Sequence, residues 1–419
     1  MKNKPNIFDV IISGGGLSGS LMALSLADLK KSDGNLLSIA IIETTNVAVS
    51  SATNTENNQP DTLFDDRVLA LSHGSAAYLN KMGVWQHVSK DACAIEKIDI
   101  SDRGHYGKAR IEAKDHGVSA LGHVIDMALL GQAQLTELAD KSNVYWFSPD
   151  KIVGINWRPN QIDTVEVKLE SGQGLTTHLL LGCDGANSPC RQLAGINTSQ
   201  SDYQQVALIA NVATKKPHNH KAYERFTEYG PLAMLPLSTL RADSNGENRC
   251  ALVWTMTPEQ SVAIMALNNE DFSQQLELAF GSWLGAISYV GKRDVYPLVL
   301  VQAEQQTYHR MALIGNASHT IHPIAGQGFN LGLRDVQQMA KQIEQALVKE
   351  NDIGSFALLN EYGQKRQQDQ NQVINLTDSL VTLFANDFPP LVAGRNIGLK
   401  VMNYVTPLKK ILVTKLMGY

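Results

Sequence analysis

A glycine-rich run around residue 326 has the residue types of a site that receives a flat, electron-rich ligand. It reads His322-Pro323-Ile324-Ala325-Gly326-Gln327-Gly328-Phe329-Asn330-Leu331-Gly332-Leu333-Arg334-Asp335. The glycines let bare backbone approach a ligand closely, and the apolar residues that follow have helical spacing. The run therefore predicts a helix N-terminus whose backbone N–H groups, around 326–328, stabilise negative charge on the ligand.

A second glycine motif lies near the N-terminus. Gly14-x-Gly16-x-x-Gly19 follows the apolar run 7–13, and Glu43 ends the next apolar run. Such glycines allow a tight turn against a pyrophosphate at a helix N-terminus, and the acidic residue can accept hydrogen bonds from ribose hydroxyls. The motif alone is weak evidence, but in this strand–helix–strand context it predicts dinucleotide binding, without separating FAD from NAD.

Three shorter motifs could complete the site: Asp65-Asp66-Arg67, Cys183-Asp184-Gly185 with Arg191, and Gly315-Asn316-Ala317-Ser318-His319. Each has a simpler explanation. The second could be an ordinary Asp-Gly turn, and the arginine of the first could be buried against a neighbouring aspartate. His319 and His322 lack the acidic or thiol partners of a metal site, so we expect them to pack and hydrogen-bond, and we expect no metal.

Taken together, these motifs resemble the ubiquinone-biosynthesis hydroxylases, a family of single-component FAD-dependent monooxygenases. The resemblance implies FAD as cofactor, NAD(P)H as a transient reductant and O2 as co-substrate. It implies that FAD contacts Gly14, Gly16, Gly19, Glu43, Arg67, Asp184, Gly185, Gly315, Asn316, Gly326, Gln327, Gly328 and Asn330. It also places Pro323, Gly326 and Gln327 at the reacting end of the flavin. Many relatives have aspartate where this chain has Asn316, which keeps the shape and an acceptor oxygen but not the charge.

Further segments resemble one branch of the family, which acts on 2-polyprenyl-6-methoxyphenol. They are Ile100-Ser101-Asp102-Arg103-Gly104-His105, Glu224-Arg225-Phe226-Thr227 with Gly230 to Pro236, and the stretch from Asp378 to Leu399. The resemblance implies hydroxylation at the C1 ring position, giving 2-polyprenyl-6-methoxy-1,4-benzoquinol.

A prenylated phenol needs an apolar channel, and several residues could line one or could equally be sheet core: Phe226, Leu232, Met234, Leu235 and Trp254. The sequence names no general base for the phenol.

The elements that must position these residues alternate between strand and helix patterns. Runs 7–13 and 36–42 predict strands around a helix over 17–29, 165–184 predicts a hairpin, and 311–315 a further buried strand. Short β-like runs fill 203–300, helical patterns cover 331–348 and 355–385, and polar Asn46–Leu63 predicts a surface loop.

We therefore expect an α/β fold of the aromatic-hydroxylase type: a Rossmann-like FAD-binding domain, an inserted β-sheet substrate domain and a helical C-terminal segment. The expected boundaries are 1–110, 150–200 and 300–350 for the FAD domain, 111–149 and 201–299 for the substrate domain, and 351–419 for the C-terminal segment.

Composition narrows the class of protein further. Of the 419 residues 43% are hydrophobic and 18% charged, as in soluble globular proteins, and the net charge of −5 argues against nucleic-acid binding. The four cysteines lack CxxC spacing, and the sequence shows no signal peptide or long apolar run. These features predict a cytoplasmic protein with reduced thiols. The mixed apolar and basic residues after 380 could contact the inner-membrane surface or another ubiquinone-biosynthesis protein, or could form a helical pair that closes the domain.

Three rival functions stay open at this level: a hydroxylase acting at another ring position, a flavin dehydrogenase, and a non-catalytic scaffold of the biosynthetic assembly. A reductase with two bound dinucleotides would carry a second glycine motif. The single motif therefore favours a monooxygenase that binds NAD(P)H only transiently.

Overall fold

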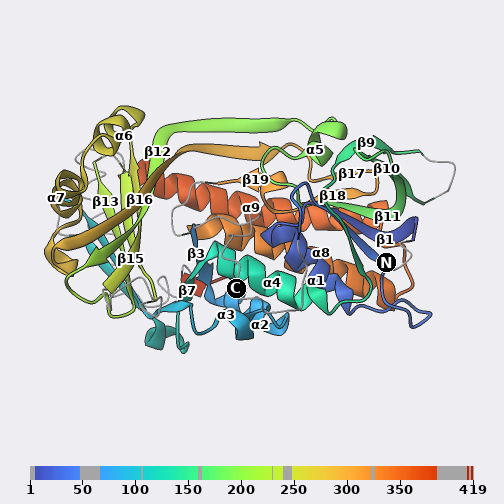
Figure 1. Ribbon diagram of the computed structural model, residues 1–419, viewed down its shortest axis with the longest axis horizontal. Helices are drawn as coiled ribbons and strands as arrows, with labels where there is room; N and C mark the ends of the chain where they lie inside the picture. The colour runs from blue at the N-terminus through green and yellow to red at the C-terminus, as the bar shows by residue number, and fades with distance from the viewer. Residues whose placement is uncertain are drawn as a thin grey trace.

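Two large β-sheets lie at opposite ends of an elongated molecule, and long helices run along it between them (Figure 1). The structure is a computed structural model that describes residues 5–47, 67–104, 107–158, 163–228, 230–238, 248–321, 326–384, 413–414 and 417–418.

The first sheet has the strand order β17-β18-β11-β1-β2-β8, with β10 paired to β11 and β9 paired to β10. Its strands are β1 (Ile7–Ser13), β2 (Ile39–Ile42), β8 (Val144–Phe147), β9 (Ile152–Asn156), β10 (Val165–Leu169), β11 (Gly174–Gly182), β17 (Thr307–Tyr308) and β18 (Met311–Leu313). The strands β18, β11, β1, β2 and β8 are parallel to their neighbours in that order. The predicted strand–helix–strand unit, the hairpin and the buried strand near 311 are confirmed.

Both faces of this sheet are buried, which explains why β1 reads as an almost continuous apolar run. Val10 and Ile12 belong to a core shared with α1 (Leu17–Ala27), α4 (Met127–Ala139), α8 (Gln327–Val348) and α9 (Phe356–Phe384). Phe8 and Ile11 face the other way, into a core formed with β9, β10 and α5 (Pro189–Leu193). The helices predicted over 331–348 and 355–385 are thus confirmed as the long pair α8 and α9.

The second sheet has the order β19-β16-β12-β15-β14-β13-β5-β6. Its strands are β5 (Lys97–Asp102), β6 (Lys108–Glu112), β12 (Thr198–Thr214), β13 (Lys221–Thr227), β14 (Gly230–Pro236), β15 (Asn248–Met256), β16 (Ile287–Ala303) and β19 (His319–Thr320). The two long strands β12 and β16 pair with each other and extend from this sheet toward the first one (Figure 1). The β-rich region expected over 203–300 is therefore confirmed.

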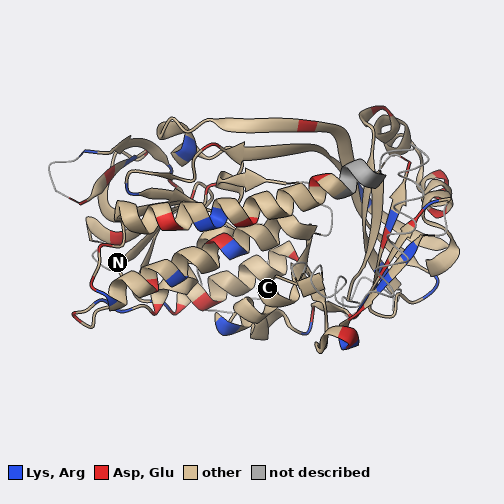
Figure 2. Cartoon of the chain, turned by 180° about the vertical axis from the view of Figure 1, so that it is seen from behind, with Lys and Arg blue, Asp and Glu red and all other residues tan. Residues whose placement is uncertain are grey.

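Smaller elements join the two sheets. A three-stranded sheet contains β3 (Val68–Ser72), β7 (Gly122–Asp126) and β4 (Cys93–Ile95). The remaining helices are α2 (His73–Lys81), α3 (Trp85–Val88), α6 (Pro258–Met265) and α7 (Asn269–Phe280), with short 3-10 turns η1 (Ala113–His116), η3 (Ser282–Leu284) and η4 (Gly315–Ala317). Seen from behind, α8 and α9 lie side by side, with acidic and basic residues between them (Figure 2).

Sheet membership indicates different domain boundaries from those expected at two points. Strands β5 and β6, inside 1–110, belong to the second sheet, whereas β8, inside 111–149, pairs in the first sheet and α4 packs on α1. We therefore propose a division that assigns 97–112 to the second sheet and 127–147 to the first. Most of the loop expected over Asn46–Leu63, and most of the chain after 384, lie outside the described residues.

Candidate active site

The predicted cofactor motifs meet because three of them follow adjacent parallel strands. Gly14 comes directly after β1, Asp184 follows the end of β11, and Gly315 follows β18. Carboxyl ends of neighbouring parallel strands lie at the same edge of a sheet. Since β1 lies between β11 and β2, this edge is the point where strand order reverses, which is where open α/β sheets bind ligands.

The N-terminal glycine motif is held in a turn that only glycine fits at two of its positions. Gly14 has a φ of +94°, and a Cβ there would lie 2.6 Å from the Cys183 carbonyl oxygen. A Cβ on Gly19 would lie 1.9 Å from the carbonyl oxygen of Gly14. Gly16 differs, since a Cβ there would have no atom of the described residues within 4 Å. Gly14 and Gly19 are therefore needed for the fold, and Gly16 leaves open space at the start of α1.

Glu43 is fixed beside this turn. Its Oε2 accepts a hydrogen bond of 2.7 Å from the Gly15 backbone N–H, and its Oε1 accepts from the Thr45 N–H at 2.9 Å and the Thr44 hydroxyl at 3.0 Å. The residue is only 7% exposed. A carboxylate has acceptor capacity for about four hydrogen bonds, so Glu43 can still accept one from a ribose hydroxyl.

Asp184 also faces this turn. Its Oδ2 accepts from the Ser13 hydroxyl at 3.3 Å and from the Cys190 N–H at 3.0 Å. Its other oxygen, Oδ1, is buried and has no hydrogen-bond partner among the described residues. Burying an acceptor without a donor is costly, so this oxygen marks a position where a ligand would donate. The Asp-Gly turn is real, since Gly185 has a φ of +79°, and it coexists with this ligand position.

The loop that carries Asn316 is tied to its surroundings through its neighbours. The Gly315 N–H donates to Asp335 Oδ2 at 2.9 Å, and a Cβ on Gly315 would lie 2.8 Å from the Ser18 hydroxyl oxygen. Arg191 donates to the carbonyls of Ala317, at 2.8 Å, and Ala186. Asn316 itself is exposed, so its side chain is available to a ligand at this edge.

The second glycine-rich run begins α8 as predicted. Gly326 is the residue before the first helical turn and has a φ of +61°, and a Cβ there would lie 2.7 Å from the Ala70 Cβ. Among the described residues, a Cβ on Gly328 would meet only Ile321, at 3.9 Å, and Gln327 is 7% exposed. The described residues therefore place little side-chain bulk over the first N–H groups of the helix. His322 and Pro323 lie outside the described residues.

Asn330 has a different role from the cofactor contact expected. Its Oδ1 accepts from the Ser72 N–H at 2.8 Å and the Ser75 hydroxyl at 2.7 Å. Its Nδ2 donates to the carbonyls of Ala70, at 2.8 Å, and Gly326, at 2.7 Å. An amide side chain has two donors and two acceptor lone pairs, so Asn330 has none left for a cofactor. We infer that it positions Gly326 against β3.

We expect Gly326→Ala to weaken flavin retention and lower the melting temperature. An alanine must adopt a left-handed φ, which costs about 1–2 kcal/mol, and its Cβ also meets Ala70. Adding Ala70→Gly should remove the contact between the two Cβ atoms and so recover the steric part of the lost stability, but not the cost of the left-handed backbone. The flavin absorbance and the melting temperature of both variants check this. A double variant no better than the single one would contradict the assigned contact.

A buried charge network behind the site was not anticipated from the sequence. Asp335 is 0% exposed, and its oxygens accept from Arg366 Nε at 2.6 Å, His319 Nε2 at 3.0 Å and the Gly315 N–H. Burial alone would raise the pKa of Asp335, but Arg366 and His319 outweigh it and hold the pKa at about 2. Arg366 also donates to Asp369, 2.6 Å away. The network joins α8 and α9 to the loop that carries Asn316.

Arg67 lies on the side of β3 that faces the second sheet. It is exposed, and its guanidinium carbon lies 5.4 Å from the centre of the Tyr296 ring on β16. The aspartates Asp65 and Asp66, which could have paired with it, lie outside the described residues. Contact of Arg67 with the flavin phosphates therefore stays a prediction.

The prediction for His319 is confirmed, because it is buried and hydrogen-bonded to Asp335. Within the described ranges, no group of three or more histidine, cysteine or acidic residues could hold a metal ion. All four cysteines are free and buried. Burial raises the pKa of the Cys93 thiol to about 11, which makes it a poor nucleophile at neutral pH.

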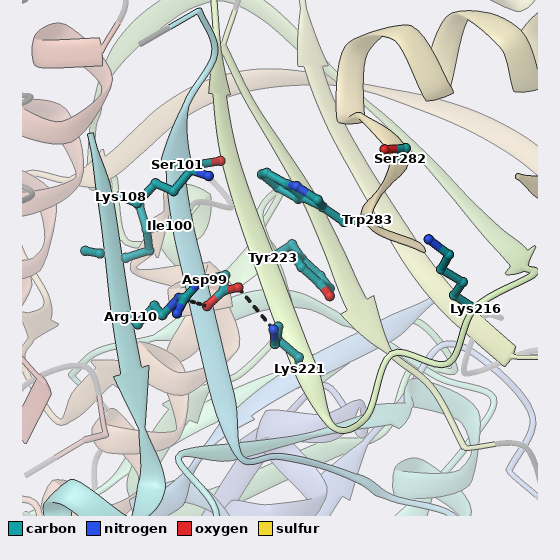
Figure 3. A pocket seen from close by; sticks show the side chains of 11 residues that line it. Asp99, Ile100, Ser101, Lys108, Arg110, Lys216, Lys221, Tyr223, Ser282 and Trp283 are labelled. Carbon is teal, nitrogen blue, oxygen red and sulfur yellow. Dashed lines mark hydrogen bonds and ion pairs between the residues drawn. The ribbon is translucent and has the colours of Figure 1, made fainter. Parts of the chain in front are cut away.

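A polar cavity lies elsewhere, on the outer face of the second sheet (Figure 3). It has a volume of about 420 Å³, and residues of β5, β6 and β13 line it with Trp283. Lys221 and Arg110 approach Asp99 there, at 3.2 and 3.6 Å. None of the glycine motifs contributes to this cavity, so it is distinct from the cofactor edge.

The described residues fit FAD. An open glycine at a helix start suits a pyrophosphate, Glu43 suits a ribose, the orphaned Asp184 oxygen suits a donor, and the start of α8 suits an electron-rich ring. FAD, when bound, supplies the electron transfer and oxygen activation that these side chains cannot perform. The fold and the site thus define a class, the FAD-binding oxidoreductases.

Comparison with known proteins places the chain within this class. The family described as FAD binding domain matches residues 8–377. Ubiquinone hydroxylase UbiL of Rhodospirillum rubrum is 32% identical over 98% of this chain and 90% of its own length. The mitochondrial ubiquinone biosynthesis monooxygenase COQ6 of Xenopus tropicalis is 30% identical over 97% and 92%. The chain therefore belongs to the FAD-binding-domain family, within its group of ubiquinone-biosynthesis hydroxylases, and is an FAD-dependent monooxygenase.

Solved structures confirm the expected aromatic-hydroxylase fold. The p-nitrophenol 4-monooxygenase PnpA of Pseudomonas putida superimposes with a TM-score of 0.74 at 17% identity, over 98% of both chains. PqsL of Pseudomonas aeruginosa, a probable FAD-dependent monooxygenase, also has a TM-score of 0.74, at 18% identity, over 94% of this chain and all of that one. In the described part of this chain, no helix is long and apolar enough to cross a membrane.

Proposed function

We propose that this monooxygenase hydroxylates a polyprenylated methoxyphenol in ubiquinone biosynthesis, at the ring carbon para to the phenol oxygen. The product would be 2-polyprenyl-6-methoxy-1,4-benzoquinol, with NAD(P)H as reductant and O2 as oxygen source. The names of the relatives support the pathway, and the branch-specific segments of the sequence support the substrate.

The structural observation that carries the proposal is an apolar, partly open face on the second sheet. The outer-face residues Leu232, Met234 and Leu252 are at most 1% exposed, under α7 and its neighbours. Their sequence neighbours on the inner face, Ala233 and Val253, are only half-buried. Since successive strand residues point to opposite faces, the inner face is an apolar surface that is not fully covered, as a prenylated ring requires.

This alternation also sorts the channel residues suggested by the sequence. Leu232, Met234 and Trp254 pack in the outer core with Phe272, so for these three the core interpretation is correct. Leu235 is half-buried on the inner face, and Phe226 is on that face but 3% exposed. Only Leu235 of the five is a partly exposed inner-face residue.

The same inner face lies beside the start of α8. Val68 of β3 packs against the cluster that contains Leu235, and Ala70, two residues further along β3, is the neighbour of Gly326. On the other side of the loop, Thr320 pairs with Val301 of β16. The residues that flank 322–325 are thus fixed between the flavin-binding edge and the second sheet, where a ring could be oriented and water excluded.

The proposal is tested by anaerobic reduction of the purified flavoprotein with NADPH, with and without 2-polyprenyl-6-methoxyphenol. We expect the phenol to accelerate bleaching of the flavin on the order of 10-fold or more, because a substrate-gated monooxygenase avoids wasting reductant. Readmitting O2 should yield the 1,4-benzoquinol.

Each other outcome has a defined meaning. A product hydroxylated at a different ring carbon would move the assignment to a related hydroxylase of the pathway. Reduction without O2 consumption on reoxidation would indicate a dehydrogenase, and failure to take up FAD would favour a scaffold. Cytoplasmic location, and contact of the C-terminal segment with the inner membrane or another pathway protein, remain predictions, because most of that segment lies outside the described residues.

A further inference from the structure

An acidic side chain lies on the largely apolar inner face of the second sheet, near its β5 end. Glu224 stands in β13, directly opposite Ala233 of β14 and Ile100 of β5. Its strand neighbour Tyr223 points to the outer cavity (Figure 3), and Arg225 stacks on Trp283 there, 4.9 Å from the ring centre. Glu224 therefore lies on the opposite, inner face.

No polar partner in the described part of the chain explains the place of this carboxylate. Within the described ranges, Glu224 has no hydrogen bond or ion pair, and it is half-buried. Burying a carboxylate without a hydrogen bond or a counter-charge is costly, and a bound ligand that donates to it would lower that cost. Structural ion pairs such as Lys221 with Asp99 lie on the other face of the same strands.

Burial alone raises the pKa of Glu224 to about 7. The groups facing it from β5 and β14 are Ile100 and Ala233, which carry no charge. Asp102, further along β5, and Arg67, which reaches the inner face at Tyr296, are charged side chains on that face, and neither contributes to the shift. A carboxyl that titrates near neutrality can exchange protons at the pH of the cell.

The position relates Glu224 to the start of α8. Ala222, two residues before it on the same face, belongs to the cluster against which Val68 packs. Val68 leads along β3 to Ala70, which touches the position of Gly326. Glu224 and the flavin-binding loop therefore border the same side of the second sheet.

We propose that the Glu224 carboxylate accepts the phenol O–H proton of the substrate during hydroxylation. This assignment rests on the proposed function. The O–H bond breaks, its electron pair stays on the phenol oxygen, and the proton moves to Glu224 Oε. The electron-rich oxygen activates the para carbon toward one oxygen atom of O2. The other oxygen atom leaves as water, with its two reducing electrons supplied by NAD(P)H. When the ring regains aromaticity, the C–H bond of that carbon breaks and its proton passes to water, and Glu224 returns its own proton to the phenol oxygen.

The test compares the pH dependence of kcat/KM in the wild type and Glu224→Gln, both loaded with FAD. The base must be ionised, so the wild-type kcat/KM should rise as pH increases through about 7 and then level off. The glutamine keeps the shape but cannot titrate. We expect it to abolish this rise and to lower kcat on the order of 100-fold, with little change in KM. Compared with Glu224→Gln, Glu224→Asp should restore part of kcat. It should also restore a rise of kcat/KM with pH, at a shifted pH.

Glu228→Gln is the matched control, because Glu228 is exposed on the same hairpin, and its profile should equal that of the wild type. NADPH reduction of Glu224→Gln without phenol should also match the wild type, which separates loss of a base from loss of the flavin site. The proposal would be overturned if kcat/KM of Glu224→Gln still rose with pH through about 7 and its kcat equalled that of the wild type. If wild type hydroxylates no phenol at all, the proposed function fails instead.

A second readout needs no activity. Because the folded pKa of Glu224 is raised, its ionisation favours unfolding as pH rises from about 4.5 through about 7. Glu224→Gln should therefore gain in melting temperature relative to the wild type over that range. If the difference in melting temperature between Glu224→Gln and the wild type stayed the same across this pH range, the placement of the carboxyl in apolar surroundings would be contradicted.

Discussion

Gly16→Val should give a folded protein without colour. Valine can adopt the backbone of Gly16, which has a φ of −65° and a ψ of −171°, and its Cβ would meet no atom within 4 Å in the part of the chain that the structure describes. The side chain would instead fill the space next to the start of α1, where the pyrophosphate is expected. A loss of roughly 3 kcal/mol corresponds to a Kd for FAD that is about 100-fold weaker. Flavin absorbance and FAD titration measure the loss of cofactor binding, and circular dichroism measures whether the fold is retained.

Gly19→Ala is the contrasting variant. Its Cβ would lie 1.9 Å from the Gly14 carbonyl oxygen, so the turn itself must move and the fold should suffer along with cofactor binding. Gly328→Val should behave like Gly16→Val, because the one described residue that the first added carbon would meet is Ile321, at 3.9 Å. A Gly16→Val protein that is yellow and active would refute the placement of the cofactor.

Asp335→Ala should be the most destabilising single change in the charge network. It removes the acceptor of Arg366, His319 and the Gly315 N–H at once and leaves the Arg366 charge buried. Breaking a buried ion pair in this way typically costs about 3–5 kcal/mol. Urea unfolding at saturating FAD measures it. Asp335→Asn should cost less, since the amide oxygen can still accept from Gly315.

The pH dependence of this variant follows from the lowered pKa of Asp335. The stabilisation is fully present above the unfolded value near 3.8 and is lost as pH falls through about 2. The difference from wild type should therefore shrink only below about pH 4. Lys365→Met is the control, because the exposed Lys365–Glu361 pair should contribute about 0.5 kcal/mol or less. Equal effects of the two variants would show that the network carries no special stability.

Local patterns predicted much of the fold because the first sheet is buried on both sides. The apolar run 7–13 is β1 to the residue, and the hairpin at 165–184 is β10 and β11. The predicted ends of strands were less accurate where an apolar run in the sequence extends beyond the strand that forms. The run at 36–42 shortens to β2, which begins only at Ile39. Which sheet a strand joins depends on contacts distant in sequence, so the pairing of β5 with β13 could not be foreseen.

The candidate site was predictable where one residue type satisfies one backbone requirement. The positive φ of Gly14 and Gly326 follows from motifs that need glycine. Asn330 was assigned to the cofactor because the signature contains it, whereas its hydrogen bonds reach Ser72 and Ser75, more than 250 positions away. The role of Asp335 depends on Arg366 in another helix, and helical spacing within either segment gives no sign of that pairing.

The long ladder between β12 and β16 has a consequence for how such enzymes could diversify. Thr198, where β12 begins, pairs with Ala303, where β16 ends, so the chain leaves the cofactor-binding half and re-enters it at adjacent points. The chain between these two residues, which includes Glu224, forms one continuous insertion whose two ends lie side by side. Recombination that exchanged this insertion would replace most of the substrate face, β5 and β6 excepted, and leave the dinucleotide cradle intact. The cofactor-binding half could therefore accept different substrate-binding segments at this one pair of strand ends.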